Sequence, residues 1–236
     1  MIEIKSISKN FGSTQALRDI DVLLEEGQCF GLIGPNACGK TTLIKSILGM
    51  VIPSQGDILF NEKSIIGDVS YRSDIGYMPQ IGKYPENMTV AQVINTIRSI
   101  RKYKVEEDLE LYHAFDIGQI AHKKMRALSG GTTQKVSATI AFLFNPKVLI
   151  LDEPTAGLDP LAADILKEKI VREHQSGKLI LITSHLLSEL DDLLTHVIFM
   201  QEGSILFNHS INALLAHTGQ DRVSKAISHV LKTKAK

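Results

Sequence analysis

The sequence has little cysteine, no excess charge of either sign and no long apolar run. Two cysteines are too few for a disulfide scaffold and are typical of a reducing compartment. The 26 basic and 26 acidic side chains cancel, which argues against a nucleic-acid partner held by a bulk cationic field. The apolar runs are far shorter than the ~20 residues that span a bilayer, and the charged N-terminus is unlike a signal peptide. We therefore expect a cytoplasmic chain, and any membrane role must come through a partner.

What the sequence does contain is the composition of a globular protein, with 44% hydrophobic and 22% charged residues among 236. Short apolar runs alternate with helical patterns, which is typical of a parallel sheet with helices on both faces. The expected fold class is therefore α/β. The predicted strands are residues 29–33, 148–151, 179–182 and 196–200, and the predicted helices are residues 40–50, 132–144 and 161–175.

Two regions interrupt this α/β pattern. Residues 2–4, 21–24 and 57–60 have the pattern of short strands in an N-terminal antiparallel sheet. Between about residues 82 and 128, apolar residues recur with helical spacing after a candidate N-cap at Thr89, which predicts an inserted helical subdomain.

One domain is therefore expected over residues 1–220, followed by a basic tail over residues 221–236. The tail has apolar residues at helical spacing and several lysines. We favour a closing helix that packs on its own domain. The alternative is a cationic amphipathic helix that touches anionic lipid or a partner.

The segment GPNACGKT matches the phosphate-binding pattern G-x-x-x-x-G-K-[ST], between a predicted strand and a predicted helix. Small residues let backbone N–H groups approach phosphate oxygens, and the helix N-terminus adds a partial positive charge. Lys40 is the candidate ligand of the β- and γ-phosphates, and Thr41 is a candidate ligand of Mg²⁺. The predicted P-loop, or Walker A, site consists of Gly34, Pro35, Asn36, Ala37, Cys38, Gly39, Lys40, Thr41 and Thr42.

Two carboxylates follow the predicted strand at residues 148–151. Asp152 is expected at the C-terminal edge of the sheet, where α/β proteins bind ligands, and could hold Mg²⁺ through water. Glu153 is expected on the other side of the strand, where it could accept a proton from the water that attacks the γ-phosphate. Together with the phosphate loop, this pair predicts hydrolysis of Mg-ATP.

These motifs, with Leu128-Ser129-Gly130-Gly131 upstream of LDEPTAGLDP, resemble those of the ATP-binding subunit of ABC transporters, and the resemblance covers the chain to about residue 215. It implies a P-loop NTPase core and a head-to-tail dimer that hydrolyses Mg-ATP. It also implies integral membrane permease subunits as partners, and a peripheral position on the cytoplasmic face of the plasma membrane. A homodimer and a heterodimer with a second ATP-binding subunit are both open.

The resemblance implies roles for further residues. Phe11 matches the aromatic residue that stacks on adenine, the alternative being a core phenylalanine. Gln80 matches the glutamine that reaches Mg²⁺ and senses the membrane partner. Residues 129–131 match the signature loop, which faces the γ-phosphate on the opposite subunit. Asp159 matches the loop that couples the two sites, and His185 matches the histidine that orients the catalytic water.

Two residues depart from the family pattern. Ala37 stands where glycine is usual, and its methyl group costs about 1 kcal/mol or more if the backbone there has a positive φ. Thr132 follows the signature where glutamine is more usual. Neither position is expected to touch the catalytic groups, so hydrolysis is still expected.

Two rival functions share parts of this pattern. A small-molecule kinase would use the phosphate loop but would not need the signature. Non-transport relatives carry either a long coiled coil between phosphate loop and signature or two cassettes in one chain, and the sequence shows neither.

The substrate is open: the motifs resemble those of multidrug, lipid and antibiotic exporters, so export is favoured. They also resemble those of the ATPase that serves nitrous oxide reductase maturation, a copper or sulfur delivery system.

Overall fold

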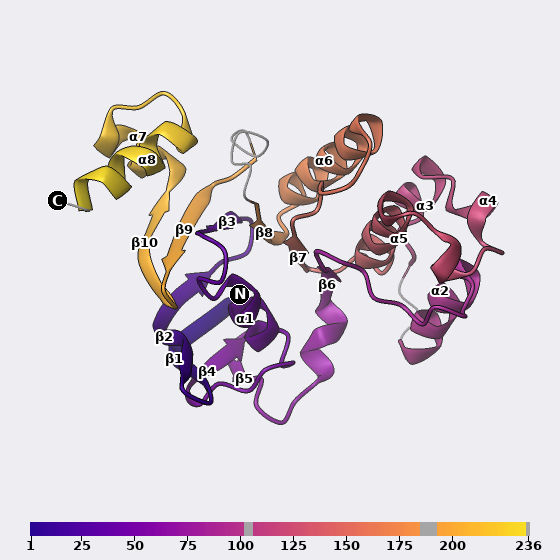
Figure 1. Cartoon of the computed structure of the whole chain (residues 1–236), viewed down its shortest axis with the longest axis horizontal. Helices are drawn as coiled ribbons and strands as arrows, with labels where there is room; N and C mark the ends of the chain where they lie inside the picture. The colour runs from indigo at the N-terminus through magenta and orange to yellow at the C-terminus, as the bar shows by residue number, and fades with distance from the viewer. Residues whose placement is uncertain (102–105, 185–192, 235–236) are drawn as a thin grey trace. The chain divides into compact units, whose positions relative to one another are not determined.

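The computed structural model describes residues 1–101, 106–184 and 193–234, and the chain divides into two compact units (Figure 1). The first unit is formed by Met1–Tyr71 together with Leu179–Lys236, and the second by Arg72–Lys178. The α/β class is confirmed, because each unit contains parallel strand pairs and helices.

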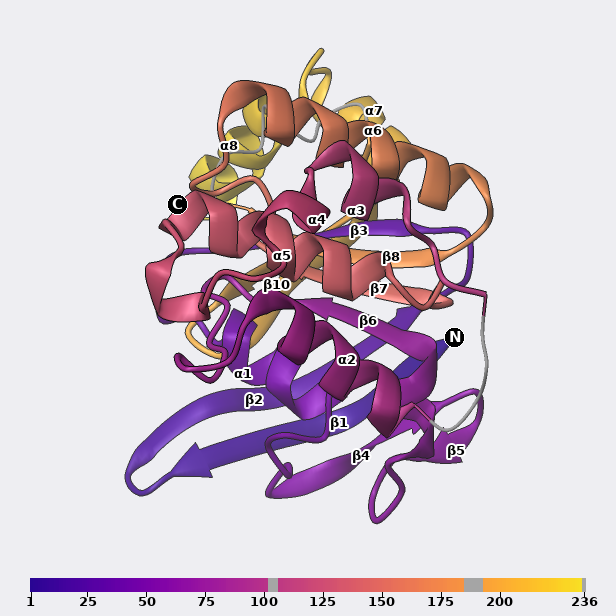
Figure 2. The same cartoon turned by 90° about the vertical axis from the view of Figure 1, so that its right-hand side faces the viewer.

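A twisted antiparallel sheet begins the first unit, and its β1–β2 hairpin is longer than the sequence predicted (Figure 2). Ile2, Ile4 and Ile7 of β1 are all buried, so the apolar side of the strand continues past residue 4. The strand bends at Ser6, which has a φ of 47° and whose N–H donates to Asp21 Oδ1 at 2.8 Å. The strands are β1 (Ile2–Phe11), β2 (Thr14–Leu24), β4 (Gln55–Phe60) and β5 (Lys63–Ser64), in the order β2-β1-β4-β5.

Buried parallel strands form the rest of the first unit's sheet structure. β3 pairs in parallel with β8 and β9, and β10 runs antiparallel to β9. Every residue of β3 and β8 is buried, as their unbroken apolar sequences predict. Burial raises the pKa of the Cys29 thiol to about 12, so this cysteine is an unreactive core residue. The bounds are β3 (Cys29–Ile33), β8 (Leu179–Thr183), β9 (His196–Gln201) and β10 (Ser204–Ser210).

Helix α1 (Lys40–Ile47) follows β3 through the glycine-rich loop and is shorter than predicted. Gly49 ends it, because its φ of 65° turns the chain and its N–H donates to Ser46 O at 2.9 Å. At the other end of the unit, α8 (Val223–Lys234) packs against α7 (Ile211–Thr218), as Figure 1 shows. The tail therefore uses its apolar face inside its own unit, and its buried residues are Val223, Ala226 and Ile227.

The second unit combines a parallel strand pair with helices. Thr89 caps α2 in a reciprocal capping box with Gln92, as the sequence predicted for Thr89. No helix among the described residues is long and apolar enough to cross a membrane. The elements are β6 (Ile75–Met78), α2 (Val90–Ile100), α3 (Glu110–Ala114), α4 (Ile117–Ile120), α5 (Gly130–Phe142), β7 (Val148–Asp152) and α6 (Pro160–Gln175), with a short 3-10 helix at Met125–Ala127. Another 3-10 helix, Ser70–Asp74, begins in the first unit and ends in the second.

Candidate functional site

The phosphate-binding loop lies between β3 and α1 in the first unit and is packed tightly on its inner side. Gly34 and Gly39 have φ values of 153° and 110°, which favour glycine. A Cβ at Gly34 would collide with the carbonyl oxygen of Met200, and one at Gly39 would lie 2.7 Å from the carbonyl oxygen of Ala16. Residues 35–37 are exposed on the outer side. The outer side of the loop is therefore open to a ligand.

Lys40 lies in the curve of this loop. Its Nζ donates to the carbonyl oxygens of Gly34 at 2.7 Å and Pro35 at 3.0 Å, while Cys38 beneath it is only 3% exposed. Thr41 is exposed at the start of α1. A cation held by backbone oxygens at a helix N-terminus suits a polyphosphate, so these residues fit the predicted nucleotide.

Ala37, which stands where glycine is usual in the family, has a positive φ of 61°. We expect Ala37→Gly to raise the free energy of unfolding by up to about 1 kcal/mol, because it removes the left-handed penalty on a residue with a Cβ. Urea denaturation measures the change. The control is Ala163→Gly inside α6, which is expected to lower stability by about 1 kcal/mol. A loss of stability in Ala37→Gly equal to that of the control would contradict the prediction.

In the second unit, the structure joins two of the predicted site residues. Gln80 Nε2 donates to Glu153 Oε2 at 2.9 Å, although the residues are 73 positions apart. Glu153 has a φ of 50°, a left-handed conformation that costs about 1 kcal/mol or more and is typical of functional sites. This backbone and the Gln80 amide together fix the direction of the carboxylate.

Asp152 ends β7 and is 7% exposed. The pKa of the partly buried Tyr77 phenol is raised to about 12, first by burial and second by the charge of Asp152. Carboxylate, amide and hydroxyl oxygens are the ligands that Mg²⁺ prefers. The chemistry of Asp152, Gln80 and Thr41 therefore fits the predicted metal.

The signature residues form the N-terminus of α5, two residues earlier than predicted. Ser129 is the N-cap: its Oγ accepts the Thr132 N–H at 3.2 Å and lies 2.8 Å from Thr132 Oγ1. Because Ser129 caps the helix, Gly130 and Gly131 are its first two residues. A Cβ at Gly130 would meet nothing within 4 Å, so this end of the helix is open.

Asp159 has a double role at the start of α6. Its Oδ1 accepts the Ala162 N–H at 2.9 Å and its Oδ2 pairs with Lys135 Nζ at 2.6 Å. The Lys135 contact, followed by the Ala162 N–H, holds the pKa of the Asp159 carboxyl below its usual range. Lys135 was not among the predicted site residues. It lies four residues after Gly131 and shares its helix face, but that spacing alone does not show which loop the face contacts.

The remaining predicted residues have different outcomes. Phe11 ends β1 and is 51% exposed, with Lys9 Nζ 5.2 Å from its ring centroid, so it is not a core phenylalanine. His185 lies outside the described residues. The first unit holds Phe11 and residues 34–42. The second holds Gln80, Asp152, Glu153, Ser129, Gly130, Gly131 and Asp159.

Comparisons with known proteins point to one family. A family model described as ABC transporter matches residues 17–156. The uncharacterized ABC transporter ATP-binding protein YhaQ of Bacillus subtilis is 32% identical over 95% of this chain and 76% of that protein. The lantibiotic transport ATP-binding protein SrtF of Streptococcus pyogenes is 30% identical over 87% of this chain and 89% of that protein. A solved ATP-binding subunit of an ABC transporter shares the fold, with a TM-score of 0.89, 24% identity and coverage of 98% and 99% of the two chains.

Proposed function

Since the chain belongs to the ATP-binding subunits of the ABC transporter family and is an ATPase, we propose that it works as a head-to-tail dimer that hydrolyses Mg-ATP to drive export through separate membrane subunits. The exposed N-terminus of α5 carries this proposal. The chain already has a full phosphate loop, and the Ser129-capped helix offers a second place for an anion. A kinase would have no use for it, whereas a dimer would place it against the partner's nucleotide.

The proposed roles follow from the residues. The loop at 34–42 and Lys40 bind the phosphates, and Phe11 stacks on adenine. Glu153, held by Gln80, accepts the proton of the attacking water, and His185 orients that water. Ser129, Gly130 and Gly131 bind the γ-phosphate on the opposite subunit.

Mg²⁺ would be held by Thr41, Asp152 and Gln80, and when bound it neutralises charge that develops on the phosphate oxygens. Asp152 is suited to this because its carboxylate is buried at a strand end. Asp159 would couple the two nucleotide sites of the dimer.

Export is proposed because the relative SrtF is named for lantibiotic transport and the motifs resemble those of exporters. The comparisons do not support the nitrous oxide reductase alternative. The partners would be integral membrane permease subunits, and this chain would bind to them peripherally at the cytoplasmic face of the membrane.

The arrangement can be tested by complementation between two inactive variants. Ser129→Arg blocks the signature and Lys40→Ala disables the phosphate loop. A mixed head-to-tail dimer rebuilds one intact site, from the loop of the first variant and the signature of the second. We expect each variant alone to be inactive and the mixture to hydrolyse ATP, measured as phosphate release.

The wild-type rate should also rise with the square of protein concentration while the dimer is the minor species. The control is a mixture of the Lys40→Ala chain with a double variant that carries both Lys40→Ala and Glu153→Gln. This mixture should remain inactive, because both chains lack the lysine. A mixture of the first two variants that stays inactive, with a wild-type rate linear in concentration, would overturn the proposed dimer.

A further inference from the structure

Phe11 ends β1 at the tip of the β1–β2 hairpin, where it faces Thr14 of β2. Lys9 Nζ lies over its ring, 5.2 Å from the centroid, a distance at which an ammonium is attracted to the π-electrons. The Phe11 side chain is nevertheless 51% exposed, so much of the ring is open to a ligand. The lysine therefore contacts the ring without covering it.

Lys9 is also held by the loop that follows α1. Its Nζ donates to the carbonyl oxygen of Ile52 at 2.7 Å. The direction of this carbonyl is constrained, because Ile52 precedes Pro53 and a residue before proline is restricted to extended conformations. The next N–H, that of Ser54, donates to the carbonyl oxygen of Ser8 at 2.7 Å and ties the loop to β1. The lysine therefore has a fixed anchor beside the ring.

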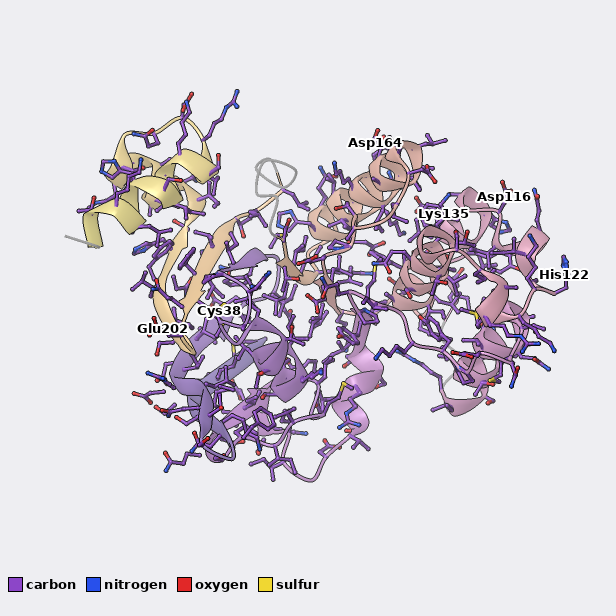
Figure 3. All side chains as sticks on the ribbon, in the orientation of Figure 1. Cys38, Asp116, His122, Lys135, Asp164 and Glu202 are labelled. Atoms are coloured by element: carbon purple, nitrogen blue, oxygen red, sulfur yellow. The ribbon has the colours of Figure 1, made fainter. Side chains whose placement is uncertain are left out.

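The same loop is joined to the helix that carries the phosphate-binding site. Near the end of α1, the carbonyl oxygen of Lys45 accepts the Met50 N–H at 2.8 Å. Figure 3 labels Cys38, which lies in the loop that leads into this helix. Hydrogen bonds therefore connect the helix to the loop and the loop to Lys9, and Lys9 contacts the Phe11 ring. These contacts all lie within the first unit.

We propose that Lys9 is a positioning residue that holds the Phe11 ring at a fixed distance from the phosphate loop, so that the ring is in place before the nucleotide binds. The inference rests on the proposed function, in which Phe11 stacks on adenine. A ring that is already fixed loses less side-chain entropy when the base binds. Lys9 would thereby raise the affinity for a nucleotide and leave the affinity for phosphates alone unchanged.

The test compares a ligand that has a base with one that has none. Mg-ADP carries adenine and is not turned over, whereas Mg-pyrophosphate offers only the phosphates, and isothermal titration calorimetry gives the Kd of each. We expect Lys9→Met to weaken Mg-ADP binding about threefold to tenfold and to leave Mg-pyrophosphate binding unchanged. The KM for ATP should rise by a similar factor at nearly constant kcat, because stacking on the base is equal in the ground and transition states.

Two further substitutions show whether Lys9 acts through the ring. Lys9→Arg keeps a cation and a donor and should retain most of the affinity for Mg-ADP. Phe11→Ala removes the ring and should weaken Mg-ADP binding about tenfold or more. The double variant with Lys9→Met and Phe11→Ala should bind Mg-ADP no more weakly than Phe11→Ala alone, because the lysine then has no ring to position.

The matched control is Lys5→Met on the same strand. Lys5 is 52% exposed and pairs with Glu3 at 3.1 Å, so its loss should change neither Kd. If Lys9→Met does not fold, Lys9→Gln replaces it in the test. Its neutral amide can still donate a hydrogen bond but is not attracted to the ring as a cation, so it should also weaken Mg-ADP binding selectively.

Three results overturn the inference. The first is wild-type affinity of Lys9→Met for Mg-ADP. The second is an equal loss for Mg-ADP and Mg-pyrophosphate, which would mean that the substitution disturbs the phosphate loop. The third is a double variant weaker than Phe11→Ala by the full factor of Lys9→Met, which would mean that the lysine acts independently of the ring.

Failure of the proposed function gives different results. Phe11→Ala would bind Mg-ADP as tightly as the wild type if the ring does not stack on adenine, and the inference would fall with that role. Failure of the proposed dimer would leave these affinities of the single subunit unchanged. It would appear instead as absent complementation between Ser129→Arg and Lys40→Ala.

Discussion

Glu153→Gln is expected to reduce ATP turnover by at least about a hundredfold while ATP binding is retained, because an amide cannot accept the proton of the attacking water. The glutamine has nearly the same size and can still bond Gln80, which now donates to an amide oxygen. Bound ATP therefore persists, and the ATP-bound dimer accumulates. Phosphate release measures the first effect. Light scattering with and without Mg-ATP measures the second.

Glu168→Gln is the matched control for this substitution. Glu168 is 73% exposed on α6, where its Oε2 lies 3.8 Å from the guanidinium of Arg172 in a surface ion pair. This variant should hydrolyse ATP at the wild-type rate and show no stable dimer. A Glu153→Gln enzyme that also turns over at the wild-type rate would show that the base is another group. Loss of ATP binding in that variant would instead assign Glu153 a structural role.

The buried strands could be predicted because their residue types leave one interpretation. Every position of β3 and β8 is apolar or small, and both runs end at the expected residues within one position. The antiparallel strands were predicted too short. In β1 and β2, apolar residues alternate with polar or charged ones, and bends at Ser6 and Asp19 break this alternation. A pattern of period two loses its register at such bends, although the strand pairing continues.

The predicted site residues come from contiguous motifs, whose spacing the backbone fixes. The contacts between motifs were not predictable in this way. Gln80 meets Glu153 because β6 and β7 run parallel and end at the same edge. Lys135 meets Asp159 because the backbones of Gly131 and Gly157 come close. Periodicity within one helix contains no information about which distant loop faces it.

A buried ion cluster in the second unit was missed for the same reason. Lys169 of α6 has a side chain that is 6% exposed, and its Nζ lies 2.5 Å from Asp108 Oδ2, 2.9 Å from Glu110 Oε2 and 2.7 Å from Glu173 Oε1. Arg172 pairs with Glu110 and Lys178 pairs with Glu173. The cluster ties α6, which begins at Asp159, to the start of α3 in the helical region.

The cluster keeps Lys169 charged despite its burial. Burial alone would lower the pKa of this ammonium, but its hydrogen bonds to Asp108, Glu173 and Glu110 outweigh burial and raise the pKa. A pKa raised in the folded state stabilises the fold fully below the ordinary lysine value of about 10.4. The contribution is lost only as the pH rises through the folded-state pKa, so it is complete at neutral pH.

Lys169→Met is therefore expected to lower the free energy of unfolding by about 3 kcal/mol at pH 7, because it leaves the buried carboxylate of Glu173 and the partly buried carboxylate of Asp108 without their shared cation. Urea denaturation measures the loss. The matched control is Lys147→Met, which removes a 68% exposed lysine paired with Asp74 at 3.3 Å and should cost less than about 1 kcal/mol. Equal losses in the two variants at pH 7 would mean that the cluster adds nothing beyond a surface ion pair, and that α6 is held to the helical region by apolar packing alone.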